Sequence, residues 1–479
     1  MRTFHFRCTH DRRGEKARPE SRNSNIETVS LEILTVAIMA TTGNGNRLST
    51  YHLLVLACGA TVSYCVRRKL SSKRSPSQKS DNNSTTTAYE TLIANGTPLV
   101  KLHHVSKIIG RSLYVKMESM NPGGTGKDRA ALNMIRFAEK EGFLPPPNNT
   151  CCDFSSDLLL APHKDSNKVD RIDSMIIQAM KKSRTGGLVV EGTSGSTGIA
   201  LATLCAARGH ACLVVLPDDQ AVEKQAILKS LGAVVYEVPT AAISNPNHYV
   251  NIARKTAKIA KEKFSINAVF IDQFENESNY QMHYQQTGPE LWNQLPSLNA
   301  FVMSSGTGGT ISGIGSYLKE KRHSIAIVLV DPPGSSLYNK IEHGVAYASE
   351  QSERTIRKHR YDTLAEGIGL DRVTHNFSLG LEAIDHAIRV TDQEAVDMAH
   401  WILKTEGLWI GSSSAMNLVG AIRTALNLKE GSKVVTMICD GGQRHATRFW
   451  NPKFILDWGL EWPLENNIPE CLRSSMHMQ

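Results

Sequence analysis

Short apolar runs alternate with longer segments rich in helix-forming residues along most of the chain, from about residue 88 to residue 465. The short runs are continuously apolar, which is typical of parallel strands buried on both faces. The pattern predicts strands at 188–191, 212–216, 234–238, 300–303, 325–330 and 434–439, and helices at 198–208, 222–231, 311–321, 392–405 and 415–428. Strands of this kind separated by helices indicate an α/β fold in which mostly parallel sheets are flanked by helices.

The first 87 residues do not share this pattern. Residues 51–66 are uncharged and are followed directly by three basic residues. As a helix this run would be about 24 Å long, somewhat short of the roughly 30 Å hydrocarbon core of a bilayer. We predict a basic, disordered leader at 1–50, a membrane anchor at 51–67 and a polar linker at 68–87, and we expect the basic cluster to keep the following domain on the cytosolic side. A targeting peptide and a soluble tail are the alternatives.

Charge and cysteine usage limit the partners. The chain of 479 residues has a formal charge of +8, but residues 1–80 alone hold 14 Lys and Arg against 5 Asp and Glu, a balance of +9. The rest of the chain is therefore close to neutral, which excludes a basic nucleic-acid-binding body. The nine cysteines form no Cys-x-x-Cys pair and no cluster at zinc-ligand spacing, so we expect reduced thiols and no metal site. Cys205, Cys212 and Cys439 lie in apolar runs and are interpreted as core residues.

The first candidate for chemistry is a lysine in a glycine-rich turn. The run Asn-Pro-Gly-Gly-Thr-Gly-Lys-Asp-Arg at 121–129 places Lys127 where the turn meets a helix. The phosphate-binding loop of an NTPase would need Gly at 121 and Ser or Thr at 128, where this chain has Asn121 and Asp128. A lysine at the positive end of a helix has its ammonium form disfavoured, which suits a nucleophile that forms a Schiff base. The alternative is an ordinary surface lysine.

Two later loops add groups that bind anions. Residues 193–198 (Thr-Ser-Gly-Ser-Thr-Gly) and 306–310 (Gly-Thr-Gly-Gly-Thr) each follow a predicted strand and precede a helix. Free backbone amides at a helix N-terminus bind phosphate or carboxylate, and the hydroxyl side chains add donors. The second loop lacks the dinucleotide-binding spacing because residue 311 is Ile. A plain tight turn is the alternative for the loop at 193–198. One amine together with two anion sites is what a pyridoxal phosphate site needs.

These motifs resemble, in type and order, those of the fold-type II pyridoxal phosphate enzymes of the cysteine synthase/cystathionine β-synthase family. Within this family the chain is similar to the membrane-associated cysteine synthase 2 type of fungi. The matching stretches are 115–129, 191–198, 217–233, 272–274, 287–290, 306–310, 366–369 and 440–445. The resemblance implies a catalytic body at 88–470, with a small mobile domain at about 118–275 and a large domain made of 88–117 and 276–470. Residues 145–186 comprise a Pro/Asn loop and a charged helix around 172–182. We predict that they form a surface insertion in the small domain, a loose, mobile excursion, with a regulatory element as the alternative.

The resemblance also implies roles for individual residues. Lys127 would carry the cofactor as a Schiff base. The cofactor's phosphate would be bound by Gly306, Thr307, Gly308, Gly309 and Thr310. The carboxylate of the amino-acid substrate would be bound by Thr193, Ser194, Gly195, Thr197 and Gln273. Gly367 would lie in a loop that faces the cofactor from the other side. Four histidines are interpreted as structural or surface residues, and of these only the last would lie near the cofactor: His103, His104, His283 and His445.

Two positions depart from the family's pattern. Ser196 stands where the family has an Asn that bonds the ring hydroxyl of the cofactor, and Gly441 stands where a Ser meets the pyridine nitrogen. We expect water to replace the missing hydroxyl at 441, because an aspartate at a strand end, here Asp440, usually faces solvent. The alternative is that Asp440 turns inward and protonates the ring, which would make it a stronger electron sink.

The activity that the resemblance implies is a β-replacement. L-Cysteine would form from O-acetylserine, or a similarly activated serine, and sulfide, in a homodimer at the mitochondrial outer membrane. A β-elimination, by a cysteine desulfhydrase or a serine/threonine deaminase, would use the same residues. A catalytically silent, membrane-tethered binding module is an alternative of a different class.

Overall fold

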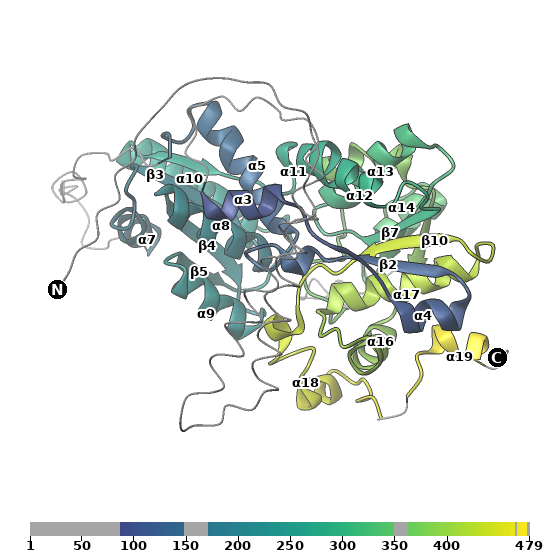
Figure 1. Ribbon diagram of the computed structural model, residues 1–479. Helices are drawn as coiled ribbons and strands as arrows, with labels where there is room; N and C mark the ends of the chain where they lie inside the picture. Colours follow the sequence, from purple (N-terminus) through teal and green to yellow (C-terminus); the bar gives the residue numbers. More distant parts are fainter. Residues whose placement is uncertain (1–86, 148–170, 349–362, 465–466, 477–479) are drawn as a thin grey trace, which may run out of the picture. The chain divides into compact units, whose positions relative to one another are not determined.

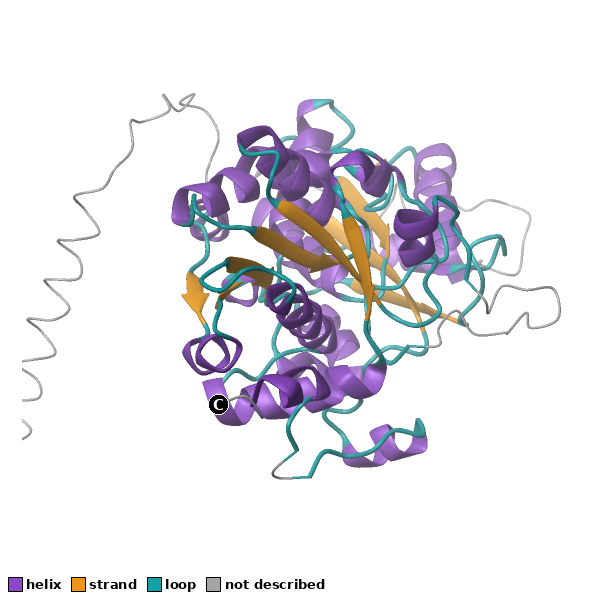
Figure 2. Cartoon of the chain, turned by 90° about the vertical axis from the view of Figure 1, so that its right-hand side faces the viewer, coloured by secondary structure: helices purple, strands orange, loops and turns teal. Residues whose placement is uncertain are grey.

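The computed structural model describes residues 87–147, 171–348, 363–464 and 467–476. The chain divides into two units, at 1–84 and 85–479, and all described residues belong to the second. These residues form two sheets, each flanked by helices (Figure 1). The strands lie inside a shell of helices when the chain is viewed from the side (Figure 2). The predicted α/β fold with mostly parallel sheets is confirmed.

The larger sheet has six strands in the order β1-β2-β10-β7-β8-β9. Its strands are β1 (Leu99–Lys101), β2 (Ser112–Lys116), β7 (Ala300–Ser304), β8 (Ala326–Asp331), β9 (His386–Arg389) and β10 (Lys433–Met437). Only β1 runs antiparallel to its neighbour; all the other pairs are parallel. The last strand in the sequence, β10, thus lies between β2 and β7, two strands that precede it by more than a hundred residues (Figure 1).

The smaller sheet has four parallel strands in the order β5-β4-β3-β6. They are β3 (Gly187–Gly192), β4 (Ala211–Pro217), β5 (Val234–Val238) and β6 (Asn267–Phe270). Successive residues of β3 and β4 enter two different clusters of buried side chains, because strand side chains point alternately to opposite faces. Both faces are therefore covered, as the continuous apolar runs predict.

The helices cover the sheets from both sides. The first group consists of α3 (Ala88–Ala94), α4 (His103–Ile109), η1 (Glu118–Met120), α5 (Lys127–Lys140), α7 (Arg171–Met180), α8 (Ser196–Arg208), α9 (Val222–Ser230) and α10 (Tyr249–Phe264). Next come α11 (Ser278–Met282), a π-helical turn η2 (His283–Thr287), α12 (Gly288–Gln294), α13 (Gly309–Lys321), α14 (Leu337–His343), α15 (His375–Ser378) and η4 (Leu381–Ala383). The last group is α16 (Asp392–Glu406), α17 (Ser412–Leu426), η5 (Gly442–His445), α18 (Pro452–Asp457) and α19 (Glu470–Met476).

The helical part of the predicted insertion differs from expectation. Helix α7 buries one face, Ile172, Ile176, Ala179 and Met180, in the cluster that covers the small sheet. Spacing of three and four residues places these side chains on one stripe, so the helix is an integral layer and no loose excursion. Residues 148–170 of the insertion lie outside the described residues.

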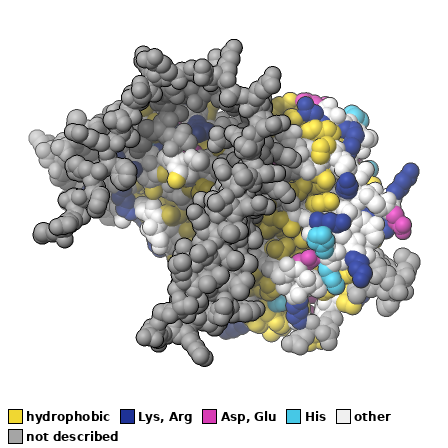
Figure 3. All heavy atoms as spheres, in the orientation of Figure 1, with side chains coloured by type: hydrophobic (Ala, Val, Ile, Leu, Met, Phe, Trp, Pro, Cys, Tyr) yellow, Lys and Arg dark blue, Asp and Glu magenta, His cyan; other side chains and the backbone are white. Residues whose placement is uncertain are grey.

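Two further predictions concern organisation. Strands of the small sheet come from 187–270, inside the predicted small domain, whereas the large sheet takes its strands from both sides of that range; the domain boundaries themselves stay a prediction. None of the helices in the described ranges combines the length and apolar character needed to cross a bilayer. The predicted anchor at 51–67 lies outside the described residues. Figure 3 shows basic side chains scattered among apolar and uncharged ones on the described part of one face.

Candidate active site

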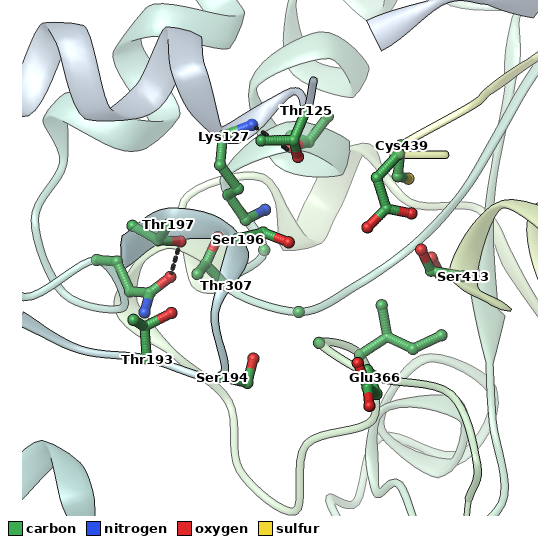
Figure 4. Close-up of a pocket in the computed structure, with 18 of the residues that line it drawn as sticks. Thr125, Lys127, Thr193, Ser194, Ser196, Thr197, Thr307, Glu366, Ser413 and Cys439 are labelled. Carbon is green, nitrogen blue, oxygen red and sulfur yellow. Dashed lines mark hydrogen bonds between the residues drawn. The ribbon is translucent and has the colours of Figure 1, made fainter. Parts of the chain in front are cut away.

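A cleft of about 870 Å³, including its open mouth, lies where loops that follow several strands meet the beginnings of several helices (Figure 4). Its walls come from segments far apart in the sequence, including Lys127 on α5, Ser194 before α8, Thr307 before α13, and Asp440 after β10. Ligands of open α/β sheets bind in such crevices at the carboxyl ends of strands. The cleft is therefore the candidate active site.

Lys127 begins helix α5 and extends into the cleft toward Ser196 and Thr307 (Figure 4). The preceding turn depends on Gly124, whose φ of +78° favours glycine. The next residue, Asp128, holds the turn by accepting a hydrogen bond from the Gly123 amide at 2.6 Å. No ion pair joins Lys127 to any residue in the described ranges. Burial lowers the pKa of the Lys127 ammonium, an effect that Cys439 and Asp440 partly oppose.

The loop before α13 is the first candidate anion site. A Cβ at Gly306 would collide with the Gly367 carbonyl, and one at Gly308, where φ is +89°, would lie 2.5 Å from Phe377. Glycine is thus needed for the backbone to pass so close to its neighbours. Helix α13 starts at Gly309, so its free amides point into this loop. The Thr307 hydroxyl is fixed by the Asn279 amide, which donates to it at 2.9 Å.

The loop before α8 is the second candidate anion site. Gly195, with φ of +131°, precedes the helix. The Thr197 hydroxyl donates to Gln273 Oε1 at 2.5 Å (Figure 4), and the Gln273 side-chain amide donates to the Gly192 carbonyl at 3.1 Å. The first helical turn of α8 is thereby tied to the end of β3. Ser194 lies at the cleft surface without a hydrogen bond to other described residues.

Besides these two loops, the cleft has a wall of charged groups. Lys224 of α9 and Glu366 form an ion pair at the cleft, and the Arg448 Nε lies 3.1 Å from Glu366. Burial opposes ionisation of Glu366, but the cations, Lys224 first, hold its pKa below the ordinary value. Asp440 is also buried, and its Oδ2 lies 3.1 Å from the His445 Nε2. Although burial opposes its ionisation, His445 and nearby cations lower its pKa as well.

The predicted residues mostly come together in this cleft. Those that line it are Lys127, Thr193, Ser194, Ser196, Thr197, Gln273, Gly306, Thr307, Gly308, Thr310 and Gly367. Three predicted residues are not part of the cleft lining: Gly195, Gly309 and Gly441. His103 and His104 are exposed on α4, away from the cleft, whereas His283 and His445 are buried.

The prediction that Asp440 faces solvent is wrong. Asp440 does not face solvent: it is 5% exposed, lines the cleft and bonds to His445, because β10 is an inner strand and its following loop is enclosed. Next to it, Gly441 is not among the residues that line the cleft, and a Cβ at this position would meet the exposed Gln443 side chain. Ser413 and Cys439 are the other groups that this wall presents (Figure 4).

Comparison with known proteins gives consistent matches. The family described as "Pyridoxal-phosphate dependent enzyme" matches residues 91–157 and 165–440. The chain is 43% identical over 371 residues to cysteine synthase 2 of Neurospora crassa, covering 76% of this chain and 73% of that protein. It is 40% identical over 404 residues to cysteine synthase 2 of Schizosaccharomyces pombe, covering 84% and 93%. A solved structure of O-ureido-L-serine synthase is similar with a TM-score of 0.56 and 25% identity, covering 75% of this chain and 93% of that one.

Proposed function

The chain belongs to the family of pyridoxal-phosphate dependent enzymes, and from that premise we propose that it forms L-cysteine by β-replacement, from O-acetylserine or a similarly activated serine and sulfide. The observation that carries this proposal is an amine without an ion pair to any described residue, Lys127, in a cleft between two glycine-bounded helix N-termini. The names of the cysteine synthase relatives support the choice of reaction.

The residues of the cleft fit the cofactor. The glycines of the 306–310 loop leave a cradle that a Cβ would fill or block, at the N-terminus of a 13-residue helix. Next to it, the hydroxyls of Ser304 and Ser305 are buried and have no hydrogen-bond partner among the described residues. We propose that this loop binds the cofactor's phosphate and that Lys127 binds its aldehyde. Pyridoxal phosphate, when bound, supplies an electron sink for a carbanion at the substrate's α-carbon.

The chain's own groups would perform the remaining tasks. The substrate carboxylate would bind at the N-terminus of α8, where Thr193, Ser194 and Thr197 supply hydroxyls. Once the substrate's amino group has replaced it at the aldehyde, Lys127 Nζ would accept the α-proton, the β-leaving group would depart (as acetate from O-acetylserine), and the proton would return to the α-carbon after sulfide is added. The lowered pKa of this lysine favours the neutral amine that such a step requires. Binding of the carboxylate is expected to close the small domain over the cleft and exclude water.

The proposal is tested with the purified catalytic body. We expect a visible absorbance band with pyridoxal phosphate, a change in this band on adding O-acetylserine, and cysteine when sulfide follows. Lys127→Ala should lose the band and reduce turnover by about 10²–10⁴-fold. The matched control is Lys140→Ala, which removes an exposed lysine at the other end of the same helix. A Lys127→Ala enzyme that keeps its turnover would refute the role of this lysine. Keto-acid release without sulfide, and no cysteine with it, would indicate β-elimination instead.

We also propose where the enzyme is located and how it assembles. The uncharged run at 51–66 supports an anchor in the mitochondrial outer membrane with the body in the cytosol. A Saccharomyces cerevisiae relative, 43% identical over 371 residues, is provisionally named a mitochondrial cysteine synthase, which supports the organelle. Protease added to intact mitochondria should remove the body, and deletion of 51–67 should release it. Protection from protease would exclude this orientation. The family resemblance supports a homodimer, which light scattering on the soluble body would test.

A further inference from the structure

A buried glutamate lies directly behind the carboxylate-binding loop. Glu191 is the penultimate residue of β3 and is fully buried. Its Oε2 accepts a hydrogen bond from the backbone amide of Asp272 at 2.9 Å. Asp272 has a φ of +56°, a left-handed conformation that is uncommon outside glycine. The Glu191 side chain thus holds a strained turn in place at the end of β6.

This turn leads directly to the substrate loop. The residue after Asp272 is Gln273, whose side chain bonds to both the Gly192 carbonyl and the Thr197 hydroxyl. The carbonyl of Gln273 in addition accepts a hydrogen bond from the Asn279 side chain at 2.9 Å. A continuous path of bonds therefore runs from Glu191 through the 272–273 turn to the first turn of α8. Displacement of that turn would displace Thr197.

The surroundings of Glu191 provide no counter-charge. No described cation forms an ion pair with it, and its Oε1 has no hydrogen-bond partner. The charged group that acts on Glu191 is Asp272, a carboxylate that is itself paired with Arg254 of α10 at 3.3 Å. Glu275 and Arg372 also act on Asp272, and the first turn of α10 brings the backbone of Tyr249 and Val250 close to Gly192.

Burial raises the pKa of Glu191 well above its ordinary value, and Asp272 raises it further, against the opposing effect of the Gln273 and Asp272 amides. An ionised carboxylate buried without a partner is very costly, so this site favours the protonated form of Glu191. Ionisation would also place a negative charge behind a loop that binds a carboxylate.

We propose that Glu191 is a positioning residue for the substrate-carboxylate loop and acts as a neutral carboxyl group through the Asp272–Gln273 turn. The inference rests on the proposed function, because it assigns the loop at 193–197 to the substrate. It predicts that Glu191 affects substrate affinity and leaves cofactor binding and the chemical step largely unchanged.

The test compares Glu191→Gln with Glu191→Met in the cofactor-loaded enzyme. Gln keeps an oxygen that accepts from Asp272 and carries no charge, whereas Met fills the space without an acceptor. Loss of one hydrogen bond corresponds to about a three- to tenfold effect. We expect Glu191→Met to raise KM for O-acetylserine by that factor with kcat and cofactor absorbance retained, and Glu191→Gln to match wild type at pH 7. In alkaline buffer the KM of wild type should rise more steeply than that of Glu191→Gln.

Several outcomes would overturn the inference. A Glu191→Gln enzyme with the same pH dependence of KM as wild type would show that ionisation of Glu191 plays no part, and this comparison holds even if Glu191→Met does not fold. Equal KM values for wild type and Glu191→Met would remove the positioning role. Asp331→Asn is the control, since Asp331 is a buried carboxyl group with a raised pKa at the end of another strand, β8; its KM should not change. A wild-type enzyme that forms no cysteine would instead refute the proposed function.

Discussion

Replacing Glu118 by Gln should destabilise the catalytic body, because this side chain neutralises a buried cation next to the cleft. Glu118 is 2% exposed and Arg129 is fully buried. The carboxylate accepts from Arg129 Nε at 2.8 Å and Nη2 at 2.9 Å, and from the Thr97 hydroxyl at 2.7 Å. Lys116, also fully buried, forms an ion pair with Glu290, and Arg129 forms a second ion pair with the same carboxylate. In Glu118→Gln two buried cations would share one carboxylate.

The magnitude follows from this geometry. Removing one partner of a buried ion pair costs about 3–5 kcal/mol, because the other charge is left uncompensated. The unit at 85–479 has an unfolding entropy of roughly 0.8 kcal/mol/K, taking about 2 cal/mol/K for each residue. The melting temperature should therefore fall by about 4–6 °C. Since Arg129 lies two residues after Lys127 on α5, the variant should also hold the cofactor less tightly.

The assay is thermal unfolding of the soluble body at one scan rate, with and without cofactor. The matched control is Glu262→Gln, which breaks a surface pair with Lys258 at 3.8 Å in which both side chains are about two-thirds exposed. Such a pair contributes less than about 0.5 kcal/mol, so the control should melt within about 1 °C of wild type.

Acidity provides a second check of the same reasoning. Burial opposes ionisation of Glu118, but Arg129 and Lys116 hold its pKa below the ordinary value of 4.5. A carboxylate with a lowered pKa stabilises the fold above its unfolded pKa, and this contribution is lost as the pH falls through its folded pKa. The gap between wild type and Glu118→Gln should then narrow in acid. Equal melting temperatures of Glu118→Gln and Glu262→Gln at pH 7 would refute the assignment.

Three further outcomes are expected. Gly308→Ala should weaken cofactor binding about tenfold or more in an absorbance titration, since its φ of +89° and its contact with Phe377 exclude a Cβ; unchanged affinity would contradict the cradle. Gly441→Ser, at φ −95° and with the end of the exposed Gln443 side chain as the nearest neighbour of the added Cβ, should keep its cofactor and melt within about 2 °C of wild type; loss of cofactor would place this residue in the cleft after all. Burial lowers the pKa of His400 from 6.5 to about 4, so the neutral ring favours folding and its contribution should be lost as the pH falls from 6.5 toward 4. Because His400 is partly exposed, this contribution to the free energy of unfolding is about 1–2 kcal/mol. Between pH 7.5 and pH 4.5 the denaturant midpoint of wild type should therefore fall further than that of His400→Phe. Equal decreases in the two proteins would contradict this prediction.

Backbone features of the site could be predicted from the sequence, whereas its charged wall could not. The loops before α8 and α13 are encoded locally, because glycines such as Gly195 and Gly308 permit conformations that other residues avoid. Lys224 and Glu366, in contrast, are ordinary charged residues in the sequence, and charged residues are usually exposed. They line the cleft only because tertiary packing brings them together as an ion pair.

The same distinction holds for the fold. Strands such as β4, with seven buried residues, could be recognised from their apolar runs. Strand β2 ends in Lys116, which is fully buried because Glu290 and the Thr97 carbonyl bind its ammonium. From the sequence alone, a lysine at the end of a strand is predicted to lie at the protein surface. Strand β1 is three residues long and half-exposed, too short to give a periodic signal.

The position of β10 between β2 and β7 has a consequence for biosynthesis. A ribosome-bound chain that ends before residue 433 has made five of the six strands of the large sheet but lacks the one that joins them. Two strand edges then remain without partners, and unpaired edges are prone to aggregate. The wall that carries Cys439 and Asp440 is missing at that stage as well. Pyridoxal phosphate should therefore bind only after nearly the whole polypeptide has been translated, and nascent chains halted earlier should depend on chaperones.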